Sequence, residues 1–370
     1  MMVLHSMASL VGGYTKLSYN DRTKKYYGKC LFCHSGTEVF CVDNKNAAFW
    51  CYSCGRHGNM EDFKIYAGLM RPQPEPEPED QGAMEIYVAA AAYYYGCLAR
   101  RTGTQAYAYI TKERGVSPET LADFGVGFAP YGGGNRSLYR HLMERFDEQS
   151  IFRSGLVKRG KYGPYDMFRN RIMFPILDRE GRVVAFGGRS LDGRGPKYLN
   201  SAESRIFNKH TILYGFQTAA EASKTEDTLL VCEGYMDLIT LQAHGVRNSA
   251  AVLGTALTKE HAGLIRCFYK KVRLALDSDG PGIQAMARSV PVLENAGLSV
   301  DTMSFSPAKD PDEFFRLYGK EALKAHAACG SAPSVLMVRA SSEPEAELVR
   351  QLVKRFRIKR EEEARLEKMG

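Results

Sequence analysis

The most informative segment of the chain reads Leu229-Leu230-Val231-Cys232-Glu233-Gly234-Tyr235-Met236-Asp237. Its first four residues form a short apolar run, which is typical of a buried strand. A carboxylate, a glycine and a second carboxylate follow, so the chain can turn at Gly234 and begin a helix near Asp237. The segment therefore predicts a strand, a turn and a helix, with two acidic side chains at the carboxyl end of the strand.

An apolar run followed by acidic residues occurs twice more, at 272–279 and at 298–312. In open α/β sheets the carboxyl ends of the strands line the ligand crevice, so the three acidic groups are expected to converge. Clustered carboxylates repel one another unless cations neutralise them, and oxygen ligands suit magnesium or manganese. The candidate residues of this metal site are Glu233, Asp237, Asp277, Asp279, Asp310 and Asp312.

Two of these acidic groups have the spacing Asp-x-Asp, in the segments 277–279 and 310–312. Residues at positions i and i+2 of an extended segment point the same way. If both segments are extended, each pair aims two carboxylates at one ion.

Four cysteines near the N-terminus form two pairs, Cys30 with Cys33 and Cys51 with Cys54, separated by seventeen residues. This spacing predicts a zinc ribbon with four thiolate ligands. The residues between the pairs predict hairpin strands at 38–42 and 47–50. Phe32 and Tyr52 are open to two interpretations, which are base stacking and packing of the small ribbon core.

Length and composition limit the number of domains and the classes of partner. A chain of 370 residues is long enough for two or three domains, and its net charge of +8 suits a nucleic-acid partner without proving one. No apolar run of about eighteen residues predicts a membrane span. The N-terminus lacks the pattern of a secretory signal, so we expect a cytoplasmic protein.

Alternating proline and glutamate at 71–82 predict an extended linker. Helices are expected at 84–101 and 105–114, and a hairpin at 172–176 and 183–186. Turn-rich loops beyond the hairpin carry Arg189, Lys197 and Lys209, which are either phosphate contacts or ordinary solvated charges. From the residues alone the second interpretation is favoured.

From residue 14 to about 330, the ordered motifs resemble those of the bacterial DnaG-type DNA primases. The motifs are Cys51-Tyr52-Ser53-Cys54-Gly55, Lys112-Glu113-Arg114-Gly115, Arg171-Ile172-Met173-Phe174-Pro175-Ile176, Val184-Ala185-Phe186-Gly187-Gly188-Arg189, Pro196-Lys197-Tyr198-Leu199-Asn200-Ser201, Ile206-Phe207-Asn208-Lys209, Glu233-Gly234-Tyr235-Met236-Asp237, Leu253-Gly254-Thr255, Asp277-Ser278-Asp279 and Asp310-Pro311-Asp312. A single Asp-x-Asp would mean little, whereas the complete ordered set is specific.

The resemblance implies a mixed α+β and α/β fold, in which a zinc ribbon precedes a primase catalytic core that contains a Toprim α/β domain. We expect a zinc-ribbon DNA-binding domain at 1–70, a linker at 71–83, a basic N-terminal subdomain of the RNA polymerase core at 84–222, a Toprim metal-binding subdomain at 223–335 and a short charged helix at 336–370.

The implied activity is synthesis of short RNA primers on single-stranded DNA from ribonucleoside triphosphates, with structural zinc and catalytic magnesium or manganese. Arg114, Arg189, Lys197 and Lys209 match the family's basic active-site residues. Glu233 matches either a metal ligand or the general acid/base proposed for Toprim enzymes.

The chain departs from the family pattern at four points. The N-terminal helix that commonly precedes the ribbon is short or missing. Cys33 replaces a usual histidine ligand, which leaves the zinc prediction intact, and Pro281 replaces a small residue. The short segment 336–370 predicts that the contact with a replicative helicase is reduced, lost or supplied by another protein.

Two other classes of function remain open. One is a different Toprim enzyme, a nuclease or a topoisomerase. A nuclease would not need the ribbon or the loops with Lys197 and Lys209, and a type IA topoisomerase needs further large domains with a nucleophilic tyrosine. The other class is a non-catalytic accessory factor that binds single-stranded DNA.

Overall fold

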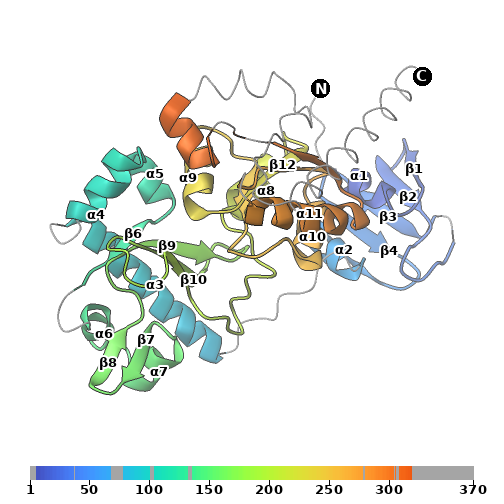
Figure 1. Cartoon of the computed structure of the whole chain (residues 1–370). Coiled ribbons are helices and arrows are strands. Elements are labelled where there is room, and N and C mark those ends of the chain that lie inside the picture. The colour runs from blue at the N-terminus through green and yellow to red at the C-terminus, as the bar shows by residue number, and fades with distance from the viewer. Residues whose placement is uncertain are drawn as a thin grey trace.

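The structure is a computed structural model of the 370-residue chain. It describes residues 6–36, 38–67, 78–100, 104–131, 136–277, 280–303, 305 and 308–318. In this part of the chain the strands form a five-stranded sheet, two four-stranded sheets and a two-stranded hairpin, and helices pack around them (Figure 1). The predicted helix at 336–370 and Asp279 lie outside the described residues.

The N-terminal unit is an antiparallel sheet with the strand order β1-β2-β3-β4-β5. Its elements are α1 (Met7–Gly12), β1 (Leu17–Asn20), β2 (Lys25–Gly28), β3 (Phe40–Asp43), β4 (Ala48–Cys51), β5 (His57–Asn59) and α2 (Met60–Tyr66). Strands β3 and β4 form the predicted hairpin, although β3 begins two residues later than expected. Phe32 packs on Phe40, Phe49 and Phe63, which confirms the core interpretation for this residue, whereas Tyr52 is 66% exposed.

Helix α3 (Pro78–Ala99) begins within the predicted linker. The prediction of an extended spacer is therefore wrong from Pro78 onward, while residues 71–77 lie outside the described part. The physical reason is that proline is favoured in the first turn of a helix, and the acidic residues after Pro78 complement the helix dipole. Gly127 lets β6 approach α3, because a Cβ there would lie 2.6 Å from the carbonyl carbon of Tyr94.

The antiparallel-sheet domain contains the second sheet, with the strand order β11-β10-β9-β6. Its elements after α3 are α4 (Thr104–Ala108), the π-helix η2 (Tyr109–Glu113), α5 (Pro118–Asp123), β6 (Gly127–Ala129), α6 (Ser137–Leu142), α7 (Glu148–Arg153), β7 (Val157–Gly160), β8 (Gly163–Asp166), β9 (Arg171–Leu177), β10 (Val183–Ser190) and β11 (Tyr198–Asn200). Strands β9 and β10 confirm the hairpin predicted from the sequence. Ser117 caps α5 through the Thr120 N–H, and Pro118 stands in the first turn of this helix.

The parallel-sheet domain has the strand order β13-β12-β14-β15, and all its neighbouring strands are parallel. Its elements are α8 (Phe216–Ala222), β12 (Thr228–Cys232), α9 (Tyr235–Ala243), β13 (Ser249–Ala251), α10 (Lys259–Arg266), β14 (Lys271–Leu274), α11 (Gly280–Asn295) and β15 (Ser299–Thr302). The apolar runs predicted as strands thus form β12, β14 and β15. Because these strands are parallel, their carboxyl ends lie at one edge of the sheet.

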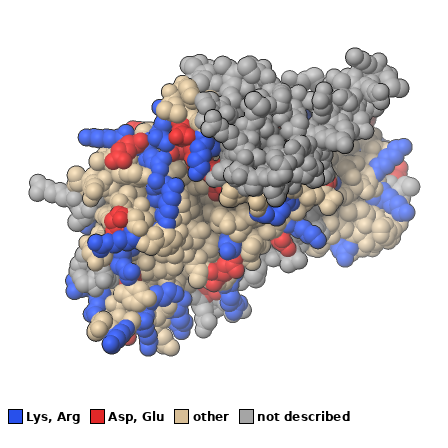
Figure 2. Space-filling view, in the orientation of Figure 1, with Lys and Arg blue, Asp and Glu red and all other residues tan. Residues whose placement is uncertain are grey.

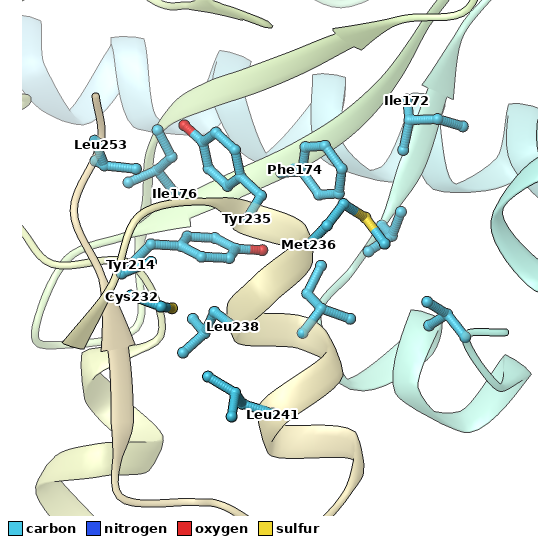
Figure 3. Packing of buried hydrophobic residues seen from close by; sticks show 14 of the residues in the cluster. Ile172, Phe174, Ile176, Tyr214, Cys232, Tyr235, Met236, Leu238, Leu241 and Leu253 are labelled. Carbon is cyan, nitrogen blue, oxygen red and sulfur yellow. The ribbon is translucent and has the colours of Figure 1, made fainter. Parts of the chain in front are cut away.

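The two larger domains share one hydrophobic core. Tyr235 of α9 stacks on Phe174 of β9, with ring centroids 4.9 Å apart and an interplanar angle of 7°, and Tyr214 meets Tyr235 edge to face (Figure 3). Such pairs add about 0.5–1.5 kcal/mol to the burial of the rings. Helix α9 therefore fixes the acidic end of β12 relative to the antiparallel sheet.

The zinc-ribbon unit contacts the parallel-sheet domain through α2. The Lys64 ammonium lies 4.0 Å from the centroid of the Phe268 ring, and only 4% of Lys64 is exposed. Burial lowers the pKa of this lysine. Next to it, the Arg179 guanidinium donates to the Glu61 carboxylate at 2.9 Å.

None of the helices in the described ranges combines the length and the hydrophobicity that spanning a bilayer requires.

Candidate functional site

The predicted zinc ligands come together at one end of the N-terminal sheet. The Sγ atoms of Cys30, Cys33, Cys51 and Cys54 all lie within 4.8 Å of one another, and those of Cys33 and Cys51 are 3.8 Å apart. Tetrahedral zinc with Zn–S bonds of about 2.3 Å requires S···S distances of about 3.8 Å. The four thiolates therefore fit a single zinc ion.

The acidic groups meet at the carboxyl edge of the parallel sheet. Glu233 follows β12 directly, and its Oε1 accepts a hydrogen bond from the Asp277 N–H at 3.3 Å. Asp277 follows β14, and its Oδ2 lies 3.5 Å from the Lys309 ammonium. Gly282 permits this approach, because a Cβ at that position would lie 2.2 Å from the Asp277 carbonyl oxygen and 3.0 Å from Glu233 Oε1.

Asp237 lies beneath this edge and is 8% exposed. Its Oδ2 accepts from the Gly234 N–H at 3.0 Å, and its Oδ1 accepts from the Asp312 N–H at 3.4 Å. Burial, followed by the nearby charges of Asp310, Asp277 and Asp312, raises the pKa of Asp237 to about 8. Both oxygens of Asp237 thus hold backbone groups of the acidic edge in place.

Asp310 and Asp312 do not form the predicted extended pair. Asp310 Oδ1 accepts from the Glu313 N–H at 2.8 Å and so caps the helical residues 311–318. Asp-Pro is a strong helix start, because aspartate caps the helix and proline is favoured in its first turn, and this overrides the Asp-x-Asp spacing. Asp312 is 2% exposed and faces Arg114, Arg316 and the Thr240 hydroxyl.

Among the described residues, the carboxylates do not converge on one point as the four cysteines do. The pKa of Asp237 is nevertheless raised, first by burial and then by the negative charges of Asp310, Asp277 and Asp312, which lie near it. Carboxylate oxygens are the ligands that magnesium and manganese prefer. The residues present therefore fit a divalent cation.

Two of the four predicted cations lie together beside the acidic edge. The Arg189 guanidinium lies 5.4 Å from the ring centroids of both Tyr109 and Tyr198, and it donates to the Tyr198 hydroxyl at 2.7 Å. Arg114 donates to the Tyr109 hydroxyl at 2.8 Å and forms an ion pair with Asp312. The sequence did not single out either tyrosine, because the π-helix that places Tyr109 has no simple sequence signal.

The other two predicted cations lie in loops. Lys197 is exposed, with its ammonium 5.9 Å from the centroid of the Tyr198 ring, and Lys209 is half-buried in the loop that precedes α8. The sequence also passed over Lys309 and Arg316, whose side chains neutralise Asp277 and Asp312.

An open groove of about 730 Å³ lies against the β7–β8 hairpin. Lys and Arg side chains gather over this end of the molecule (Figure 2). The cationic residues that line the groove are Arg136, Lys161, Arg169, Arg171 and Arg194, and its aromatic residues are Tyr131, Tyr162 and Tyr165. These residues come from four separate segments, so sequence spacing gave no sign of the groove.

Comparison with known proteins identifies three successive family models in the chain. They are a CHC2 zinc finger at residues 3–68, the N-terminal domain of the DNA primase catalytic core at 93–220, and a Toprim-like domain at 230–315. The chain is 34% identical over 342 residues to a DNA primase of Clostridium acetobutylicum, covering 86% of this chain and 56% of that protein. The chain thus spans about half the length of the curated relatives it matches.

Two solved structures are similar over most of their length. The Aquifex aeolicus primase, with its zinc-binding and RNA polymerase domains, has a TM-score of 0.63 and 28% identity, covering 93% of this chain and 88% of that chain. The DnaG primase catalytic domain bound to single-stranded DNA has a TM-score of 0.61 and 35% identity, covering 68% and 79%. These matches confirm the predicted fold class of a zinc ribbon, a primase core and a Toprim domain.

Proposed function

The chain belongs to the family of DnaG-type bacterial DNA primases, and on this premise we propose that it synthesises short RNA primers on single-stranded DNA. The parallel-sheet domain is its Toprim domain. In the proposed reaction the 3′-hydroxyl of a ribonucleotide attacks the α-phosphate of an incoming ribonucleoside triphosphate, and pyrophosphate leaves.

The acidic edge is the proposed catalytic metal site. Glu233, Asp277 and Asp310 are the described carboxylates that would hold magnesium or manganese, together with Asp279. When bound, the metal would orient the triphosphate and neutralise charge that develops during transfer. Asp237 and Asp312 use both carboxylate oxygens within the protein, so we assign them the role of positioning this edge.

The cations beside the acidic edge would bind phosphate groups. Arg114 and Arg189 lie near it, and Lys197 and Lys209 would extend the same track of positive charge. The groove lined by Arg136, Lys161, Arg169, Arg171 and Arg194 is the proposed path of the single-stranded template. Its tyrosines would stack on bases without sequence preference, as aromatic residues do in other single-strand binding grooves.

The zinc ribbon would make a second contact with the template. On its outer sheet face Trp50 stacks on His57, with ring centroids 4.3 Å apart, and Trp50 remains 46% exposed. Tyr52 offers a further exposed ring. Zinc has a structural role here, because its four ligands tie together the turns that lie next to these residues.

The observation that carries this proposal is the arrangement of the acidic edge, where parallel strands bring Glu233 and Asp277 into contact. The test is synthesis without added primer on single-stranded DNA, with labelled ribonucleotides and either magnesium or manganese. The wild-type chain should make short labelled RNA, and Glu233→Gln should reduce synthesis at least about 100-fold, because a metal contact contributes several kcal/mol to the transition state. Binding of DNA to the cationic groove should be unchanged.

Glu226→Gln is the matched control, since Glu226 is exposed in the loop that precedes β12, at the opposite end of this strand. Cleavage of labelled DNA without synthesis would identify a Toprim nuclease instead. Strand binding with neither reaction would identify an accessory factor. A contact with a replicative helicase stays a prediction, because residues 319–370 lie outside the described part of the chain.

A further inference from the structure

We propose that Tyr109 is a positioning residue that holds the two arginines of the site, Arg114 and Arg189, in a fixed relative orientation. The proposal rests on the proposed function, in which both arginines bind phosphate groups. Tyr109 itself is half-buried, and Arg114 links it to Asp312 at the acidic edge.

Tyr109 contacts each arginine in a different way. Its hydroxyl accepts a hydrogen bond from Arg114 Nε at 2.8 Å, and its ring lies 5.4 Å from the Arg189 guanidinium. Arg189 also contacts the Tyr198 ring at the same distance, and the Tyr198 hydroxyl accepts from Arg189 Nη1 at 2.7 Å. Arg189 therefore contacts two tyrosine rings, and one of these tyrosines, Tyr109, also binds Arg114 through its hydroxyl.

The π-helix explains how Tyr109 reaches Arg114. Two residues five positions apart lie about 140° apart around an α-helix, at 100° per residue. Here the Arg114 N–H donates to the Tyr109 carbonyl at 3.0 Å, which is the wider turn of a π-helix and brings the two side chains to one side. π-Turns in proteins occur frequently at functional sites, and this one carries a tyrosine and an arginine of the same network.

Because Arg114 and Arg189 both contact Tyr109, their positive charges repel each other unless nearby groups compensate them. The ring faces of Tyr109 and Tyr198 and the Asp312 carboxylate supply this compensation. A guanidinium held in this way has already lost most of its side-chain freedom before phosphate binds. Tyr109 should therefore affect phosphate binding and catalysis without touching the substrate.

The test is a double-mutant cycle of Tyr109→Leu and Arg189→Ala. Three quantities are measured for each variant: the kcat/KM of ribonucleotide incorporation, the affinity for ATP with magnesium, and the affinity for a labelled single-stranded oligonucleotide. The two binding measurements distinguish triphosphate from DNA backbone as the phosphate that the arginines bind. In the wild-type background Tyr109→Leu should lower kcat/KM, and at least one of the affinities, about ten-fold or more.

In the Arg189→Ala background the same substitution should change these quantities less than in the wild-type background, because only the part of its effect that acts through Arg114 remains. Equal losses in both backgrounds, or no loss in the wild-type background, would overturn the proposal. Tyr107→Leu is the control, because Tyr107 is exposed in the adjacent helix α4.

Tyr109→Phe keeps the ring and removes only the hydroxyl, so it serves if Tyr109→Leu does not fold. Its smaller loss of kcat/KM and of affinity should disappear in an Arg114→Ala background. An undiminished loss there would again contradict the proposal. If the wild-type chain synthesises no RNA, the proposed function fails. The two binding measurements then still decide whether Tyr109 acts through the arginines.

Discussion

Arg114 and Asp312 are 198 residues apart in the sequence and form an ion pair between the π-helix η2 and the acidic edge of the Toprim domain. The side chain of Arg114 is 16% exposed and that of Asp312 only 4%. Thr240 donates to the other carboxylate oxygen of Asp312 at 3.1 Å. The pair therefore links the antiparallel-sheet domain to the strand ends that carry the proposed metal site.

Replacement of Asp312 by alanine should lower the free energy of unfolding of this core by about 3 kcal/mol, because it leaves a largely buried guanidinium without its countercharge. Urea unfolding followed by circular dichroism measures the effect. Asp301→Ala is the control, because Asp301 pairs with Arg273 on the surface, where such pairs contribute about 1 kcal/mol or less. Similar losses of unfolding free energy in the two variants would show that the Arg114–Asp312 pair stabilises the fold no more than a surface ion pair does.

Stability should also depend on pH through His261, which is fully buried in α10. Its Nδ1 accepts from the Thr258 N–H and its Nε2 lies 3.3 Å from the Ile212 carbonyl oxygen, as expected for a neutral ring. Burial lowers the pKa of His261 to about 4. Between about pH 6.5 and 4 the unfolded chain binds a proton at this position and the native chain does not. Stability should therefore fall as the pH falls through this range.

The contribution of His261 to this fall is on the order of 3 kcal/mol. Replacement by glutamine removes the titrating group, so the stability of His261→Gln should depend less steeply on pH between 6.5 and 4 than that of the wild-type chain. His141→Gln, which removes a half-exposed imidazole elsewhere in the chain, is the comparison variant. Parallel curves for the wild type and His261→Gln would exclude the buried imidazole as a source of acid sensitivity.

The sequence predicted those features that depend on local patterns. The apolar run ending at Cys232 predicts β12 and places Glu233 at its carboxyl end, and the paired cysteines predict the zinc site directly. The interpretation of Asp310 and Asp312 failed because two local signals compete, and helix capping at Asp-Pro outweighs an extended Asp-x-Asp segment.

Features that depend on contacts between distant segments had no local signal. The contact between Arg114 and Asp312 depends on the packing of the antiparallel-sheet domain against the parallel-sheet domain. The groove lined by Arg136 and Arg194 likewise depends on the position of the β7–β8 hairpin. The family resemblance selected Arg114 and Arg189 as basic active-site residues, and in the structure both contact Tyr109, but the resemblance gave no reason for their orientation. That reason is the position of Tyr109 in a π-helix.

Zinc should be present at one ion per chain, and Cys51→Ser/Cys54→Ser should lose it. The ribbon has a small core around Phe40, Phe49 and Phe63, so its folding should depend strongly on the metal. Metal analysis gives the stoichiometry, and limited proteolysis should cleave the double variant within the ribbon before the rest of the chain. Cys41→Ser is the control, because Cys41 is buried in the same sheet but is not part of the four-cysteine group. Full zinc retention in the double variant would contradict the assigned ligands.

Gly282→Ala should disturb the proposed metal site while preserving the fold. The added Cβ would lie 2.2 Å from the backbone oxygen of Asp277, which cannot move aside as a flexible side chain can, and 3.0 Å from Glu233 Oε1. The Asp277 backbone must therefore shift, and the contact between Asp277 and Glu233 should be lost. RNA synthesis measured against manganese concentration should need about ten-fold more metal or more, because displaced ligands and their supporting contacts weaken metal binding by such factors.

Gly82→Ala provides the matched control for this substitution. Gly82 lies in α3, where an added Cβ meets no atom within 4 Å, and alanine is favoured over glycine in a helix by up to about 1 kcal/mol. This variant should keep the wild-type metal requirement with equal or higher stability. If Gly282→Ala also kept the wild-type metal requirement, with an unchanged unfolding midpoint, the close approach of Gly282 to the Asp277 carbonyl would have no role in forming the site. The metal would then have to be held by carboxylates whose positions do not depend on this turn.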